Sequence, residues 1–172
     1  MSAEEELQEH AEHAHNPFDK KVAASMAVIA ACLAVVSVLG HIYTTEELLE
    51  QQKASDMWSE YQGKSIRRYE STFVADIMAV AKAPDAAAKY KANVEKYDRE
   101  GKELQEKARD HEHESKLSGQ RALRLHLGEV FLEIAIVFAS LAILAKRDLL
   151  WWVSLASGGL GAVIALTTAL LQ

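Results

Sequence analysis

Three long apolar runs divide the chain. They cover residues 22–43, 127–145 and 149–171, and they enclose a polar stretch, 44–126, that has no comparable run. A helix rises about 1.5 Å per residue, so runs of this length can cross a hydrocarbon layer of about 30 Å. We therefore predict an all-α integral membrane protein with three membrane-spanning helices, the first of which begins at residue 20.

The polar stretch is predicted to form a helical hairpin outside the membrane. Pro84 is the only proline after Pro17, and it lies near the centre of the stretch. Proline breaks a helix interior but suits a first turn, so we expect one helix to end near Lys82 and the next to begin near Asp85. Residues 44–126 would then be an antiparallel, coiled-coil-like hairpin with its turn near 83–85.

A stripe with alternating spacings of four and three residues supports this hairpin, because such spacing keeps one face of a helix against a partner. With the turn centred near residue 84, the hairpin would set Tyr61 against Ala108 and Trp58 against His111. The stripe consists of Tyr90, Val94, Tyr97, Gly101, Leu104, Ala108, His111, Ser115, Ser118, Ala122, Leu125, Glu129 and Leu132.

Before the turn, the first hairpin helix is apolar over more than one stripe, and a single partner helix cannot easily cover it all. A third layer made by the same chain could cover the excess, as could neighbouring protomers. We favour the protomers, because exposed apolar patches usually mark interfaces, and we expect Phe73 and Ile77 to make the contacts. The main stripe contains Ile66, Tyr69, Phe73, Ile77 and Val80.

Two acids are the best candidates for chemistry. Glu129 and Glu133 lie four residues apart, just inside the second span. Ionisable groups are costly there unless they are paired or reach water, and they commonly mark an ion or proton site. The predicted register sets His41 opposite Glu129 and Ser37 near Glu133. The alternative is structural, with both acids reaching back to water at the headgroup level.

Histidines and acids lie close together in two places. His10 and His13 precede the first span, and His111 and His113 belong to the hairpin. Such spacing can ligate zinc or nickel. We instead expect a solvated charged face and no metal, because the predicted topology puts the two groups on opposite sides of the membrane.

The third span carries small residues four apart, which let membrane helices approach closely. The contact could lie within one protomer or between protomers. These residues are Ser154, Ser157, Gly158, Gly159 and Gly161.

Short flanking charges predict the orientation. Lys20 and Lys21 precede the first span, and Lys146 and Arg147 join the second to the third. The positive-inside rule places both clusters in the cytoplasm, so the acidic segment 1–19 would be cytoplasmic and the hairpin outside.

Charge and motifs exclude several classes of function. The net charge is −6, and the stretch 44–126 holds 15 Lys and Arg against 16 Asp and Glu, which argues against a nucleic-acid surface. The chain has no phosphate-binding glycine loop, nucleophile elbow, zinc-protease motif or cysteine pair. We expect neither an enzyme nor a cofactor.

One segment resembles a known family. The run from Ala54 to Arg67, ASDMWSEYQGKSIR, follows a Glu/His-rich N-terminus and a span, and precedes two closing spans. In this it is similar to the bacterial membrane family catalogued as domain of unknown function 4337. The family is uncharacterised, so the resemblance implies a three-span bacterial protein but no catalytic residue or ligand.

Together these features predict a homo-oligomeric structural or scaffolding protein of the bacterial inner membrane, in contact with lipid. Two alternatives stay open. One is an oligomeric ion or proton channel that uses Glu129, Glu133 and His41. The other is an accessory subunit of a larger membrane complex that docks through the hairpin tip.

Overall fold

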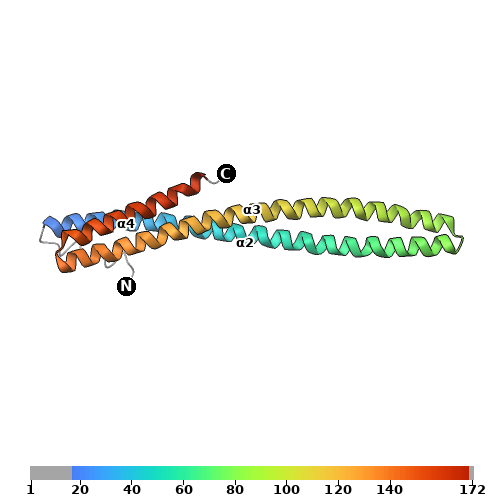
Figure 1. The fold of residues 1–172 in the computed structure, drawn as a ribbon, viewed down its shortest axis with the longest axis horizontal. Helices are drawn as coiled ribbons and strands as arrows, with labels where there is room; N and C mark the ends of the chain where they lie inside the picture. Colours follow the sequence, from blue (N-terminus) through green and yellow to red (C-terminus); the bar gives the residue numbers. More distant parts are fainter. Residues whose placement is uncertain (1–16, 171–172) are drawn as a thin grey trace. The chain divides into compact units, whose positions relative to one another are not determined.

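The structure, a computed structural model, describes residues 17–170, and these are helical apart from two short turns. The helices are α2 (Pro17–Val80), α3 (Pro84–Ala145) and α4 (Asp148–Leu166), followed by the 3-10 helix η1 (Thr167–Leu170). Figure 1 shows α2 and α3 as a neighbouring pair. The predicted all-α class, with two long helices packed together and a shorter third, is confirmed.

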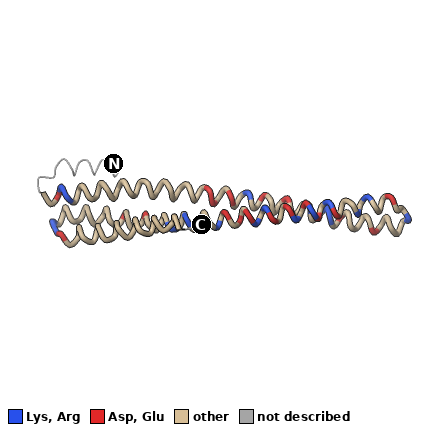
Figure 2. The backbone as a smooth tube through the Cα atoms, turned by 90° about the horizontal axis from the view of Figure 1, so that it is seen from above, with Lys and Arg blue, Asp and Glu red and all other residues tan. Residues whose placement is uncertain are grey.

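The chain divides into two compact units, which we describe separately. The hairpin unit is Glu46–Lys116. The membrane unit consists of the described residues up to Thr45 and from Leu117 onward. Charged residues are dense along the hairpin unit and sparse in the membrane unit (Figure 2).

The membrane unit contains segments of α2, α3 and α4. Three helical segments of the described chain, in α2, α3 and Asp148–Leu170, are long and apolar enough to cross a membrane. Two buried clusters join the helices. One holds Ile29, Val36, Leu125, Leu132 and Ala135, and the other holds Val22, Met26, Ala139 and Ala142.

Small residues bring α3 and α4 together within one chain. A Cβ atom added to Gly161 would lie 2.7 Å from the carbonyl oxygen of Gly128, so the two backbones nearly touch. The Ser154 hydroxyl donates to the Ala135 carbonyl at 2.7 Å, and the Ser157 hydroxyl donates to Phe131 at 2.8 Å. Gly158 is also buried here, whereas Gly159 faces open space. Of the two arrangements considered for this motif, the structure contains the one within a protomer.

In the hairpin unit, α2 and α3 also meet over small side chains. Ala54, Ala75 and Ala108 are buried, and Gly101 lies against the Tyr61 ring. Tyr61 therefore faces Gly101 and not Ala108, about two helical turns from its predicted partner, whereas Trp58 bonds Glu112, the residue next to its predicted partner His111. The predicted stripe itself is buried where expected, at Gly101, Ala108 and Ser115.

The two turns share one backbone design. Lys82, after α2, has φ 56°, and Lys146, after α3, has φ 49°. In each turn the amide of the next residue bonds a carbonyl five positions back, Ala83 to Met78 at 3.0 Å and Arg147 to Ala142 at 3.3 Å. This is a left-handed helix cap. The hairpin turn is therefore centred just before Pro84. Pro84 is the first residue of α3, a position that favours proline.

Candidate functional site

A network of polar side chains lies in the membrane unit, where α2 and α3 approach the hairpin unit along the chain. It consists of Ser37, His41, Thr44, His126 and Glu129, and we call it the His126 network. One imidazole nitrogen of His126, Nδ1, is 3.0 Å from Oε2 of Glu129. The other, Nε2, is 3.1 Å from the Thr44 hydroxyl. His126 thus links the two helices.

Gly40 makes room for this imidazole. A Cβ at Gly40 would lie 3.1 Å from Cε1 of His126, tighter than an ordinary contact. The Thr44 hydroxyl also bonds the Gly40 carbonyl at 3.0 Å, one turn back along α2. The Ser37 hydroxyl bonds Glu129, which completes the path from α3 back to α2.

The network differs from the predicted site in its histidine. His41 was expected to face Glu129, but His126 is its partner, and the His41 ring lies edge-on to the His126 ring with centroids 6.2 Å apart. The sequence did contain a signal for His126, because it lies three residues before Glu129 on the same helix. Ser37, expected near Glu133, bonds Glu129 instead.

Glu133 is not part of the network. It is exposed on the surface of the unit, whereas the side chain of Glu129 is only 19% exposed. The two acids expected to act together therefore have different surroundings. In chemical terms the His126 network can hold or pass a proton between an imidazole and a carboxylate, and Glu133 stands apart from it.

In the hairpin unit, a second group of titratable side chains joins α2 to α3. Oε2 of Glu50 is 2.6 Å from Nδ1 of His111, and Oε1 accepts a hydrogen bond from Lys53 at 2.6 Å. The Lys53 ammonium, and then His111, lower the pKa of Glu50. The carboxylate is therefore held ionised between two donors.

This group includes His111, one of the four histidines considered as metal ligands. Possible ligand atoms of Glu50, His111 and Glu114 lie within 4.8 Å of one another. Both Glu50 oxygens already have protein partners, Lys53 on the same helix and His111 on α3, so Glu50 and His111 link the two helices. His113 is exposed and outside it, and His10 and His13 lie outside the described residues.

Cross-helix ion pairs continue along the hairpin. Lys64 bonds Glu100 at 2.6 Å, and Arg68 bonds Asp98 at 2.5 Å. The pKa of Glu100 is lowered chiefly by Lys64, and that of Asp98 by Lys102 and then Arg68. Because each pair needs one specific alignment of α2 on α3, these bonds favour the observed register.

An apolar stripe runs along the outside of α2 in the hairpin unit. Its five large side chains lie three or four residues apart and are between 45% and 85% exposed. A groove of about 500 Å³ opens beside Phe73, Ile77 and Val80. We call this surface the tip stripe; it comprises Ile66, Tyr69, Phe73, Ile77 and Val80.

Comparison with known proteins decides the family. The family model described as "Domain of unknown function (DUF4337)" matches residues 18–171. The chain belongs to this family. The match extends across both units of this DUF4337 protein, and it confirms the resemblance seen in the sequence. Neither the curated proteins nor the solved structures gave a match.

Proposed function

We propose that this DUF4337 protein is a homo-oligomeric structural component of a membrane, in which the tip stripe of one copy packs against another. The observation that carries the proposal is the exposure of the stripe. Phe73 is 67% exposed and Tyr69 is 65% exposed on a unit rich in charged residues. Contiguous apolar surface of this kind, outside a bilayer, usually marks an interaction site.

The spacing of the stripe suits a helical partner. Ile66, Tyr69, Phe73, Ile77 and Val80 follow intervals of three, four, four and three residues along α2. Such intervals keep the side chains on one face, where a second helix can pack along them. The buried residues Ser71 and Ala75 occupy the opposite face, against α3. The stripe is thus available without disturbing the hairpin.

The test is to place charges on the stripe. In the double variant Phe73→Glu, Ile77→Glu we expect the oligomer to dissociate, measured by cross-linking in native membranes and by light scattering in mild detergent. The matched control is Thr72→Glu, Ala79→Glu, which changes exposed residues of the same helix off the stripe. A monomeric unmodified protein in both settings would overturn the proposal. A stripe-dependent complex with a different protein would support the role of accessory subunit instead.

A second candidate function is proton or cation conduction, and the His126 network is the observation that favours it. It joins hydroxyl, imidazole and carboxylate groups in sequence at the start of the second span. Conduction predicts proton flux in liposomes that is lost in Glu129→Gln. Glu133→Gln is the comparison, since Glu133 lies outside the network. Absence of flux from a correctly assembled protein would exclude this function.

We further propose a bacterial inner-membrane location with the hairpin unit outside the cytoplasm. The two basic clusters support a common side, because Phe18, beside Lys20 and Lys21, packs edge-on to Trp151 with ring centroids 6.4 Å apart. Ala83→Cys in a Cys32→Ser background should react with a membrane-impermeant maleimide in intact cells whose outer barrier is opened. Reaction only after inner-membrane lysis would reverse the orientation.

A further inference from the structure

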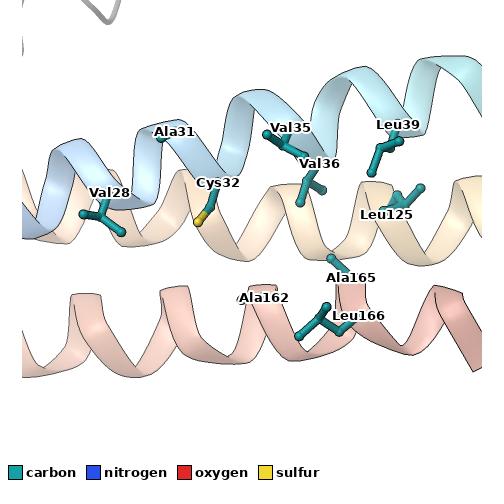
Figure 3. Close-up of a pocket in the computed structure, with 10 residues that line it drawn as sticks. All are labelled: Val28, Ala31, Cys32, Val35, Val36, Leu39, Leu125, Ala162, Ala165 and Leu166. Carbon is teal, nitrogen blue, oxygen red and sulfur yellow. The ribbon is translucent and has the colours of Figure 1, made fainter.

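An apolar groove of about 560 Å³ lies in the membrane unit between α2 and α4 (Figure 3). Leu125 of α3 contributes to its lining. Apart from the thiol of Cys32, the ten lining side chains are aliphatic. They come from residues 28–39 of α2, residue 125 of α3 and residues 162–166 of α4.

The groove is a poor site for water and a good one for hydrocarbon. A water molecule needs polar partners, and the lining supplies almost none. Val28 and Val35 are 64% and 60% exposed, so the groove is open at the side of the helices. All three helices are apolar enough to cross a membrane, and the solvent at such a surface is the acyl chain.

One end of the groove is basic. Three residues at this end lie within about one turn of a lining residue of the same helix. Tyr43 is four residues after Leu39, Arg121 is four residues before Leu125, and Thr167 directly follows Leu166. The Arg121 guanidinium lies 5.5 Å from the centre of the Tyr43 ring, and Nη1 of Arg124 donates to the Thr167 carbonyl at 2.9 Å.

Arg121 and Arg124 thus lie within about one helical turn of Leu125, the groove residue of α3. A guanidinium offers five donors, so Arg121 and Arg124 can each bind a phosphate beside the protein partners that they already have. Glu129, a nearby carboxylate of the same helix, is bonded to His126 and Ser37. The donors of the two guanidinium groups at this end of the groove therefore suit an anion.

We propose that the groove binds one acyl chain of an anionic phospholipid, with the lipid phosphate held by Arg121 and Arg124. An aliphatic slot beside basic side chains matches the two parts of such a lipid. The lipid site is independent of the tip stripe and of the proposed oligomer.

Cys32 provides a direct probe. It is the single cysteine of the chain, is exposed, and lines the groove. In delipidated protein in detergent, we expect phosphatidylglycerol to slow the reaction of Cys32 with a maleimide at lower concentration than phosphatidylcholine does. Native mass spectrometry should show phosphatidylglycerol bound to the same protein.

Variants separate the two parts of the site. Each of Arg121→Gln and Arg124→Gln should raise the phosphatidylglycerol concentration for half-protection about fivefold, because a basic residue near a lipid headgroup contributes about this factor. Lys146→Gln, Arg147→Gln, a basic pair in the other connection, should leave protection unchanged. Arg121→Lys, Arg124→Lys keeps the charge and should retain the preference for phosphatidylglycerol if the glutamine variants fail to fold. Ala162→Phe should fill the groove and abolish protection.

Three outcomes would overturn the proposal. Equal protection by both lipids would mean ordinary acyl solvation without a headgroup site. Protection unaffected in the glutamine variants would exclude the two arginines. Protection that follows protein concentration and not lipid would assign the groove to a second copy of the chain.

Discussion

Small residues line the α2–α3 seam of the hairpin unit and the α3–α4 seam of the membrane unit, but different bonds surround the two seams. In the hairpin unit, charged side chains cross between the helices, as in the Lys64–Glu100 and Arg68–Asp98 pairs. In the membrane unit, hydroxyl groups bond backbone carbonyls, as Ser154 bonds Ala135. Charged pairs are easily solvated in water but costly among lipid chains, where short hydroxyl bonds and close packing replace them.

The closeness of the backbones differs in the same way. In the membrane unit, Gly161 and Gly128 bring α4 and α3 into direct backbone contact. In the hairpin unit, a Cβ at Gly101 would meet only the Tyr61 ring, at an ordinary 3.5 Å. Glycine is therefore required where two membrane helices touch, and it is replaceable where a side chain separates the helices.

The two units also differ in what can cover their exposed apolar side chains. Val137 of the membrane unit and Phe73 of the hairpin unit are similarly exposed, at 58% and 67%. Lipid can cover the first. Under the proposed function a second copy of the chain covers the other, so similar exposure would have different neighbours in the two units.

The largest expected effect tests backbone contact in the membrane unit. Gly161→Ala forces α3 and α4 apart, because its Cβ would lie 2.7 Å from a backbone oxygen. Overpacking of this kind costs about 1–3 kcal/mol, so we expect Tm to fall by several degrees in detergent.

Gly159→Ala is the matched control, since a Cβ there meets nothing within 4 Å. It should leave Tm unchanged or slightly higher. Equal losses in the two variants would mean that α4 does not pack on α3 through Gly161.

The spans and the hairpin could be predicted because each depends on local pattern. Apolar length defines a span, and Pro84 marks where α3 begins. The register could not be predicted to the turn. Lys82 has a left-handed backbone conformation, which a lysine in the sequence does not predict, and this conformation moves the centre of the turn. The side-chain pairs that then form, such as Lys64 with Glu100, depend on that shift.

The candidate site shows the same limit. Glu129 could be identified because an acid inside an apolar run is unusual, whatever its partner. The choice between His41 and His126 depends on register, and the predicted register favoured His41. Glu133 shares a helix with Glu129, but a four-residue step rotates it toward the surface, and only the placement of α2 shows that Glu129 is the inner one.

In the hairpin unit we expect that Gly101 can be replaced without loss of stability. Gly101→Ala should raise stability by about 0.5–1 kcal/mol, because alanine loses less backbone entropy in a helix and its Cβ fits beside Tyr61. Thermal unfolding followed by circular dichroism measures the gain. Gly63→Ala, where a Cβ meets nothing within 4 Å, gives the same helix effect without packing. A loss at Gly101 beside a gain at Gly63 would show that the hairpin seam is as tight as the membrane one.

A hydroxyl group should matter where it is buried and joins two helices, and not where it is exposed and bonds within one helix. Ser154 is fully buried, and its bond joins α4 to α3. Ser154→Ala should cost about 0.6 kcal/mol, a typical value for such bonds between membrane helices. Ser59→Ala removes an exposed hydroxyl that bonds Ser55 within the same helix, and it should cost nothing measurable. Denaturation in mixed micelles compares the two; a larger loss at Ser59 would contradict the assignment of the buried bond.

Acid should weaken the hairpin unit by a modest amount. The folded pKa values of Glu50, Asp98 and Glu100 lie below their ordinary 4.5, 3.8 and 4.5, because each carboxylate has a basic partner. Groups with lowered pKa bind fewer protons when folded, so their contribution is complete above the ordinary values and is lost as pH falls through the folded ones. Asp98 and Glu100 are partly exposed, and salt screens them, so the effect is small.

Trp58 reports on the hairpin unit, where its indole donates to Glu112 at 2.8 Å. In a Trp151→Phe, Trp152→Phe background, its fluorescence should show a midpoint of thermal unfolding that is constant near pH 6 and declines below about pH 5. Asp98→Asn, Glu100→Gln should lower the midpoint at neutral pH and flatten this decline, and high salt should do the same. An equally steep decline in the double variant would mean that other carboxylates cause it, and that the cross-helix pairs align the hairpin without stabilising it.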